Sequence, residues 1–79
     1  MKFKSVKWSK GWIQIEEVTK RRGWLVVIGH NPEAYRPYCV HYAGNGHYFN
    51  TLYEARAYCY GRGWLANDAL IYKEECNAV

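Results

Sequence analysis

The chain has 79 residues, of which 49% are hydrophobic and 18% aromatic, and its formal net charge is +4. This length predicts a single domain, residues 1–79, and excludes a large enclosed active site, because so short a chain buries only a modest part of its surface. The hydrophobic share excludes a disordered chain, and no apolar run approaches the roughly 18–20 residues that cross a bilayer. No apolar stretch of a signal peptide follows the charged residues 1–4, so we expect a cytoplasmic protein with no membrane partner.

The first two strands are predicted over residues 2–8 and 12–18, joined by a turn at residues 9–11. The glycine that ends this turn has the position at which a three-residue hairpin loop commonly needs a left-handed residue. The register places Trp8 opposite Trp12. Both faces of the hairpin are half apolar, so alternation leaves open which face is buried. We expect the two tryptophans on an open face and the other large apolar side chains inside: Phe3, Ile13 and Ile15.

A third strand is predicted over residues 24–28. A basic turn, residues 19–23, precedes it, and a loop with two prolines, residues 29–37, follows it. The strand is apolar at every position, which predicts a central strand that is covered on both faces. We expect the helix of this domain to cover one face of the sheet and the opposite face to be partly open.

A second hairpin is predicted over residues 38–43 and 47–50. Asn-Gly between two strand-like runs is among the strongest hairpin signals in a sequence. With Asn45-Gly46 as a two-residue turn, Tyr42 lies opposite Phe49 and forms an aromatic cross-strand pair.

The helix begins at a capping box, Thr51-Leu52-Tyr53-Glu54. The Thr51 hydroxyl can accept from the Glu54 amide, and the Glu54 carboxylate can reach back to the Thr51 amide. One stripe of the helix is predicted to face the core and another to face outward: Leu52, Ala55 and Cys59 inside, with Tyr60 at the edge, and Glu54, Ala57 and Tyr58 outside. Gly61 is expected to end the helix as its left-handed C′ residue, with Gly63 preventing continuation.

Trp64-Leu65 is expected to return to the core. A last strand is predicted over residues 69–72, followed by a frayed tail, residues 74–79. The resulting order is β-β-β-β-β-α-β. We therefore predict an α+β fold, a single two-layer domain with an antiparallel sheet of about five to six strands and one helix packed on one face.

Candidate reactive residues are few. Three cysteines, an odd number with no Cys-x-x-Cys pair, indicate reduced thiols and not a disulfide framework. Cys39 and His41 share a strand face and form the one nucleophile–base pair that could support a small enzyme. A metal site would need residues whose spacing matches no zinc pattern: Cys39, His41, His47, Cys59 and Cys76. We predict no catalytic residue, no metal and no cofactor, and a protein that is not an enzyme.

Positive charge is concentrated at the start of the chain. Residues 1–22 hold seven cations and two glutamates, whereas residues 23–79 hold four cations and five carboxylates. Cations beside aromatic rings are typical of nucleic-acid platforms and of protein interfaces. We predict a surface for a partner or a nucleic acid, formed by Lys2, Lys4, Lys7, Trp8, Lys10, Trp12, Lys20, Arg21 and Arg22. The alternative is that both tryptophans are buried and the cations form an ordinary solvated face.

The segment Phe49-Asn50-Thr51-Leu52-Tyr53-Glu54-Ala55-Arg56-Ala57-Tyr58 resembles the strand-to-helix junction of many short β-β-β-α proteins of phages and mobile elements. In layout the chain resembles the small accessory proteins of these elements, of which the anti-CRISPR proteins are the best-known group. The resemblance implies an inhibitor in the host-cell cytoplasm that contacts a host protein or ribonucleoprotein complex through its basic, aromatic face. Many such inhibitors are acidic DNA mimics, whereas this chain is basic.

Two functions therefore remain as expectations. The first is a non-enzymatic inhibitor of a host defence complex that acts by protein–protein contact. The second is a nucleic-acid-binding module that contacts DNA or RNA with the same face. Either could be a monomer or, through pairing of an exposed edge strand, a homodimer.

Overall fold

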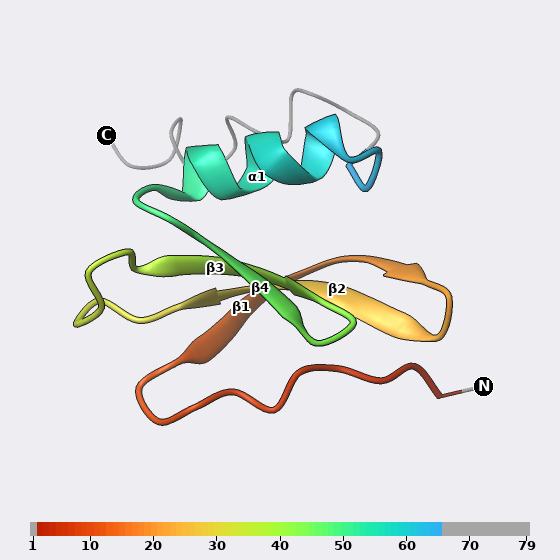
Figure 1. The fold of residues 1–79 in the computed structure, drawn as a ribbon, viewed down its shortest axis with the longest axis horizontal. Helices are drawn as coiled ribbons and strands as arrows, with labels where there is room; N and C mark the ends of the chain where they lie inside the picture. Colours follow the sequence, from red (N-terminus) through yellow and green to blue (C-terminus); the bar gives the residue numbers. More distant parts are fainter. Residues whose placement is uncertain (1, 66–79) are drawn as a thin grey trace.

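The protein is an α+β domain with one helix on an antiparallel sheet (Figure 1), as predicted. The structure is a computed structural model that describes residues 2–65. Among residues 2–65 the sheet has four strands, in the order β1-β2-β3-β4, and not the five to six predicted, because residues 2–8 do not form a strand. Strands and helix have these bounds: β1 Ile13–Arg21, β2 Trp24–His30, β3 Tyr38–Tyr42, β4 Asn45–Phe49 and α1 Leu52–Gly61. The predicted strand over residues 69–72, the tail 74–79 and Cys76 lie outside the described residues.

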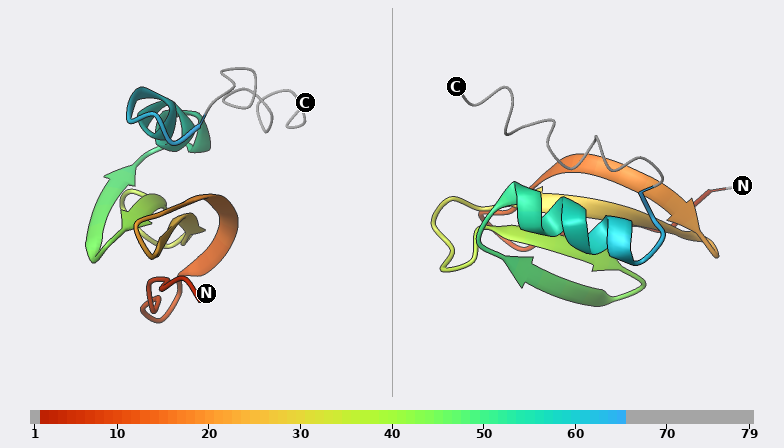
Figure 2. Two further views of the ribbon diagram at one scale, coloured as in Figure 1. Left: turned by 90° about the vertical axis from the view of Figure 1, so that its right-hand side faces the viewer. Right: turned by 90° about the horizontal axis from the view of Figure 1, so that it is seen from above.

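The two faces of the sheet are covered by different parts of the chain. Helix α1 lies over one face, and the N-terminal segment, residues 2–12, runs across the other (Figures 1 and 2). Between these two layers, Val26, Val27 and Ile28 of β2 are completely buried. The prediction of a central strand covered on both faces is therefore confirmed. The face opposite the helix, predicted to be partly open, is crossed by the N-terminal segment but stays partly exposed, since Tyr48 on that face is 51% exposed.

The predicted first hairpin is also wrong, since residues 2–8 do not form a strand. Their one ladder contact is a parallel bridge from Lys4 to Trp24, in which the Lys4 amide donates to the Gly23 carbonyl at 2.8 Å and the Leu25 amide donates to the Lys4 carbonyl at 2.7 Å. The turn before β1 is present, with Gly11 at φ +93°. Strand β1 pairs along its whole length with β2 instead, which leaves residues 2–8 to cover the sheet.

The second hairpin forms with a different turn. Tyr42 pairs with Asn45, so the two turn residues are Ala43 and Gly44, at φ +51° and +83°. Phe49 lies opposite Tyr38 and not opposite Tyr42 as expected. In the expected register, the first residues of β3 would have their partners beyond residue 50, where the helix begins, so β3 could not be fully paired. The observed register pairs all of β3 first.

The N-terminus of α1 has the predicted capping box. The Thr51 hydroxyl accepts from the Glu54 amide at 3.1 Å. The same hydroxyl donates to the Glu54 carboxylate at 3.1 Å. The Glu54 carboxylate therefore contacts the Thr51 side chain and not the Thr51 amide as predicted. Both hydrogen bonds fix the first turn of the helix at the end of β4.

The C-terminus of α1 is set by Gly63 and not by Gly61. Gly63 has φ +80° and follows the cap residue Arg62, and the Trp64 amide donates to the Cys59 carbonyl at 2.9 Å. This is the pattern of a Schellman motif, in which a left-handed residue turns the chain back over the last helical turn. The turn directs Trp64 and the following Leu65 into the core, as predicted.

The helix buries more of its surface than the stripe pattern indicates. Ala55 and Cys59 are fully buried, as expected. Ala57 and Tyr58, expected to face outward, pack against the core. Arg56 is 4% exposed and forms an ion pair with Glu16 of β1. The stripe pattern does not predict this burial, because the carboxylate that pairs with Arg56 comes from a strand 40 residues away in the chain.

Candidate functional site

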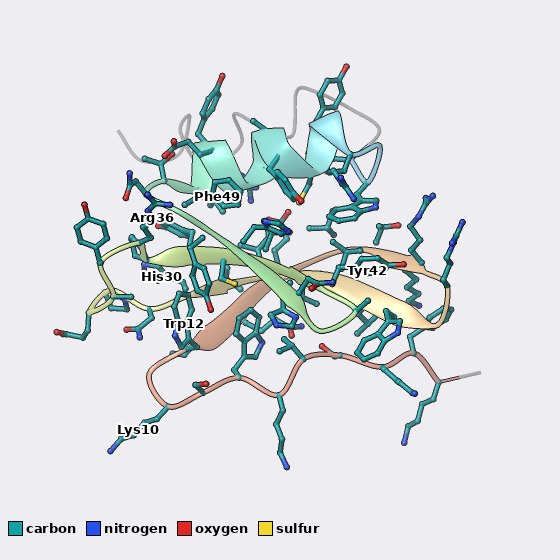
Figure 3. All side chains as sticks on the ribbon, in the orientation of Figure 1. Lys10, Trp12, His30, Arg36, Tyr42 and Phe49 are labelled. Atoms are coloured by element: carbon teal, nitrogen blue, oxygen red, sulfur yellow. The ribbon has the colours of Figure 1, made fainter. Side chains whose placement is uncertain are left out.

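The predicted binding residues divide into two groups. The seven cations, Lys2, Lys4, Lys7, Lys10, Lys20, Arg21 and Arg22, are all exposed. Trp8 and Trp12 are half-buried between the N-terminal segment and the sheet. Figure 3 shows Lys10 projecting away from the molecule while Trp12 points toward the strands. The structure therefore brings the cations to the surface and uses both tryptophans in packing.

The two tryptophans lie on the sheet face opposite the helix. Their ring centroids are 6.0 Å apart with planes 20° apart, and Trp8 also contacts the His41 ring at 5.8 Å. Trp8 fits there because residue 29 is glycine: a Cβ at Gly29 would lie 2.5 Å from Cη2 of Trp8. Trp12 contacts the Tyr48 ring at 5.7 Å. The tryptophans thus lie together on the face opposite the helix, as expected, but they are half-buried there and not exposed.

The isoleucines expected inside are exposed, Ile13 at 69% and Ile15 at 45%. Ile13 lies at the start of β1, which is an edge strand. Ile15 lies at the first of two shifts in the register of β1 against β2, between Gln14 and Glu16, and the second shift lies between Glu17 and Thr19. Each shift breaks the strict alternation on which an assignment of faces depends. Phe3 is half-buried, and the Lys20 ammonium lies 5.4 Å from its ring centroid.

A shallow cavity of about 120 Å³ opens beside the tryptophans. We call it the tryptophan hollow, and it is lined by Val6, Lys7, Trp8, Ser9, Trp12, His41 and Tyr48. Tyr48 is 51% exposed, so this hollow presents aromatic surface to solvent. It is the part of the predicted site in which aromatic and cationic groups remain together.

Most of the other cations gather at one end of the molecule. The first residues of the N-terminal segment, the β1–β2 turn and the C-terminus of α1 all lie at that end (Figures 1 and 2). Backbone hydrogen bonds of Lys4 with Gly23 and Leu25 hold the N-terminal segment to the turn. We call this the basic end, defined by Lys2, Lys4, Lys20, Arg21, Arg22 and Arg62. Sequence reasoning missed Arg62, because only the fold places it beside residues 40 positions earlier in the chain.

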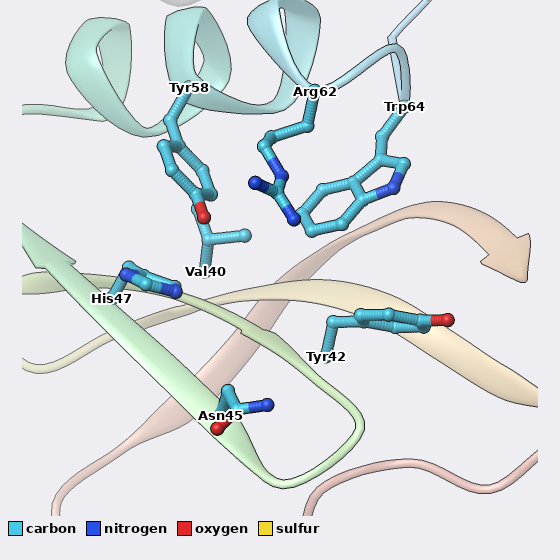
Figure 4. A pocket seen from close by; sticks show the side chains of 7 residues that line it. All are labelled: Val40, Tyr42, Asn45, His47, Tyr58, Arg62 and Trp64. Atoms are coloured by element: carbon cyan, nitrogen blue, oxygen red, sulfur yellow. The ribbon is translucent and has the colours of Figure 1, made fainter.

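A second cavity lies at the basic end, between the β1–β2 turn and the end of α1. Its volume is about 470 Å³, and we call it the arginine cleft, lined by Arg21, Arg22, Tyr42, Gly61, Arg62 and Trp64. A smaller cavity of about 80 Å³ adjoins it (Figure 4) and shares Tyr42, Arg62 and Trp64 with it. The other residues of this smaller cavity are Val40, Asn45, His47 and Tyr58.

Aromatic rings form the walls of these two cavities. The Tyr42 and Trp64 ring centroids are 5.2 Å apart, and the Arg62 guanidinium lies 5.3 Å from the Trp64 centroid and 5.9 Å from that of Tyr58. Figure 4 shows the Arg62 side chain between these last two rings. No carboxylate lines either cavity within residues 2–65, and none there pairs with Arg21, Arg22 or Arg62. The cleft is therefore cationic and aromatic together.

The candidate nucleophile and metal ligands lie elsewhere. Cys39 and His41 share the sheet face of the tryptophans, as their spacing predicts. Burial raises the pKa of the Cys39 thiol and lowers the pKa of His41, so burial favours the uncharged form of both groups. His47 and Cys59 contact the helix-side layer instead. Within residues 2–65, no three His, Cys, Asp or Glu side chains are grouped as metal ligands would be.

Among the described residues, no helix has the length and apolar character of a membrane span. Comparisons of the chain with protein-family models, with curated protein sequences and with solved structures gave no match. The resemblance to anti-CRISPR proteins therefore stays a prediction. Within residues 2–65, the fold and the cavities define a small α+β domain with a cationic end and cavities that are lined by aromatic rings.

Proposed function

We propose that this protein is a non-enzymatic nucleic-acid-binding protein that holds the phosphate backbone with its exposed cations. The proposal is supported by the excess of exposed positive side chains over unpaired carboxylates in residues 2–22. Seven cations are exposed there, whereas one of the two glutamates, Glu16, is already paired with Arg56 of the helix. Glu17 is thus the one carboxylate of residues 2–22 that lacks an arginine partner among the described residues, beside seven exposed cations.

Phosphate contacts supply most of the sequence-independent affinity for nucleic acids, because each cation that neutralises a phosphate releases condensed counterions. The seven exposed cations lie on the N-terminal segment and on the end of β1 with its following turn, and backbone hydrogen bonds of Lys4 join these two parts. Such an arrangement supports contacts with several successive phosphates of one strand.

The test is binding of labelled oligonucleotides by fluorescence anisotropy at salt concentrations from 50 to 300 mM. A variant with Lys2, Lys7 and Lys10 replaced by alanine leaves Lys4 and Lys20, which contact aromatic rings, in place. We expect binding that weakens steeply with salt, and a slope of log K against log salt that is smaller by about 2 in this variant, at about 0.7 per lost phosphate contact. The matched control is Arg36→Ala, an exposed cation in the loop after β2, at the other end of the sheet (Figure 3).

Two results would contradict the proposal. One is the absence of oligonucleotide binding at 50 mM salt. The other is an equal effect of Arg36→Ala and of a single substitution in the N-terminal segment, because that would show that only net charge matters.

A second candidate function is contact with a protein partner, such as the host complex that the resemblance to anti-CRISPR proteins implies. The tryptophan hollow supports it, because Trp8, Trp12 and the exposed Tyr48 are residue types that dominate protein interfaces. Binding of this kind depends on aromatic contacts and weakly on salt. Retention of a partner after nuclease treatment and at 300 mM salt, with loss in Tyr48→Ala, would favour this function over the first.

A further inference from the structure

We propose that the arginine cleft is a binding site for one unpaired nucleotide of a single strand, with its phosphate on the arginines and its base against the aromatic wall. This inference rests on the proposed function and adds a site and a preference that backbone contacts alone do not give.

Three guanidinium groups from two separate elements line the cleft. Arg21 ends β1, Arg22 lies in the β1–β2 turn, and Arg62 caps α1. Attraction of a cation to the helix C-terminus accounts for Arg62 alone. The other two arginines have no carboxylate partner within residues 2–65. Like charges around one cavity repel one another, and a bound anion relieves that repulsion.

The backbone at Arg22 is a separate observation. Arg22 has φ +50°, a left-handed conformation that favours glycine or asparagine in a two-residue hairpin turn. The chain thus has a long cationic side chain where the backbone favours a small residue, at a position that faces the cleft. Ala43 has the same conformation in the other hairpin turn, at φ +51°, so what distinguishes Arg22 is its long cationic side chain at the cleft.

The aromatic wall indicates that the anion carries a flat group. Tyr42 is half-buried beside Trp64, and the volume of about 470 Å³ lies within the range of roughly 300–1,000 Å³ that is typical of small-ligand pockets. The amide of Asn45 and the imidazole of His47 line the adjoining cavity and offer hydrogen-bonding groups beside the rings. A simple phosphate would need the arginines but not these rings.

The base must be unpaired, because in a duplex each base is already stacked between its neighbours. Unpaired bases stack on tyrosine and tryptophan, with a gain of about 5- to 150-fold in affinity per base. A cleft between a hairpin turn and a helix end admits one strand whose bases turn outward.

The experiment compares three labelled probes on the full chain: a 12-nucleotide oligothymidine, the same phosphate backbone without bases, and a 12-base-pair duplex. We expect the oligothymidine to bind at least 5-fold more tightly than the abasic strand and the duplex. In Tyr42→Leu, which keeps an apolar side chain against the core, the affinity for oligothymidine should fall to that for the abasic strand without a change in salt slope.

Arg22→Gly removes the guanidinium and also suits the left-handed backbone, so loss of folding cannot explain its effect. We expect weaker binding of the oligothymidine and of the abasic strand, and a salt slope smaller by about 0.7. Arg36→Ala is again the matched control, and near-ultraviolet circular dichroism checks the fold of each variant.

The outcomes separate the two proposals. If no probe binds at 50 mM salt, both proposals fail. If all three probes bind equally and Tyr42→Leu has no effect, while the triple lysine variant still weakens binding, the cleft proposal alone is overturned. Tighter binding of a phosphoserine peptide than of oligothymidine would also overturn it, since the cleft would then be a site for phosphorylated protein.

Discussion

Replacing Gly29 by alanine should lower the stability of the protein strongly, although alanine is ordinarily the better strand residue. A Cβ at this position would lie 2.5–2.8 Å from three ring atoms of Trp8, closer than real Cβ contacts allow. The peptide of Gly29 belongs to a central, buried strand, so the ring must move. We therefore expect Gly29→Ala to displace Trp8 from the sheet.

Two opposing contributions set the change in the free energy of unfolding. The loss is limited by the packing of Trp8, because a half-buried tryptophan contributes about 2–3 kcal/mol from its buried apolar area. The gain is about 0.5–1 kcal/mol, because alanine is more favourable than glycine in a regular strand. The expected loss is thus about 1–2.5 kcal/mol, which lowers the melting temperature by roughly 4–20 °C in a domain of this size.

The assay is urea unfolding of Gly29→Ala, Trp8→Ala and the double variant, followed by circular dichroism. In the Trp8→Ala background the obstacle is gone, so Gly29→Ala should change sign and stabilise the protein by about 0.5–1 kcal/mol. Gly61→Ala is the control, because a Cβ there meets no atom within 4 Å. A loss of the same size with and without Trp8 would refute the reasoning.

Three further predictions concern the ion pair, the second hairpin turn and a buried thiol. Glu16→Leu should lower the free energy of unfolding by about 2–3 kcal/mol, because it removes the carboxylate from buried Arg56. Replacing both residues by leucine should restore most of this loss in urea unfolding. Equal losses in the single and the double variant would contradict the prediction. Ala43→Asn should raise the melting temperature, because Ala43 has φ +51°, and a lower value would contradict the observed turn. Burial, with a smaller contribution from the Glu16 charge, raises the pKa of Cys59 from 9.0 to about 12, so unfolding releases a proton between these pH values and stability falls there by up to about 1.4 kcal/mol per pH unit. In Cys59→Ala, urea unfolding between pH 8 and 10.5 should show a smaller decrease, and parallel curves would contradict it.

Local signals explain what the sequence predicted correctly. The apolar run of β2 needs cover on both faces whatever provides it, and the capping box Thr51–Glu54 is complete within one turn of helix. The register of the second hairpin was mispredicted because a shift of the turn from residues 45–46 to 43–44 does not change the face to which each side chain points. The alternation of apolar and polar residues therefore fits both registers equally, and only the start of the helix decides between them.

The candidate site depended on contacts that no local pattern encodes. The assignment of faces failed at β1, where two register shifts break alternation, and at Gly29, whose missing side chain makes room for Trp8. The sequence pattern assigns Gly29 to the loop after the strand, whereas β2 continues to His30, so the close approach that a strand glycine commonly marks is not predicted. The exposed cations of residues 2–22 were predictable from the sequence. The place of Arg62 beside them was not, because it depends on where the helix ends in the fold.

The aromatic residues of this chain are divided between the two faces of one small sheet, and that division separates stability from binding. On the face of the N-terminal segment, Trp8 and Trp12 cover the strands, so substitutions there should change the free energy of unfolding first. On the helix side, Tyr42 and Trp64 pack against the core and also border a cavity with three arginines. Arg21 and Arg22 are exposed, whereas Arg62 also caps α1 and lies against the rings of Tyr58 and Trp64. Binding measurements on Arg21 and Arg22 variants therefore report on the surface, whereas an Arg62 or aromatic variant needs its stability measured beside its affinity.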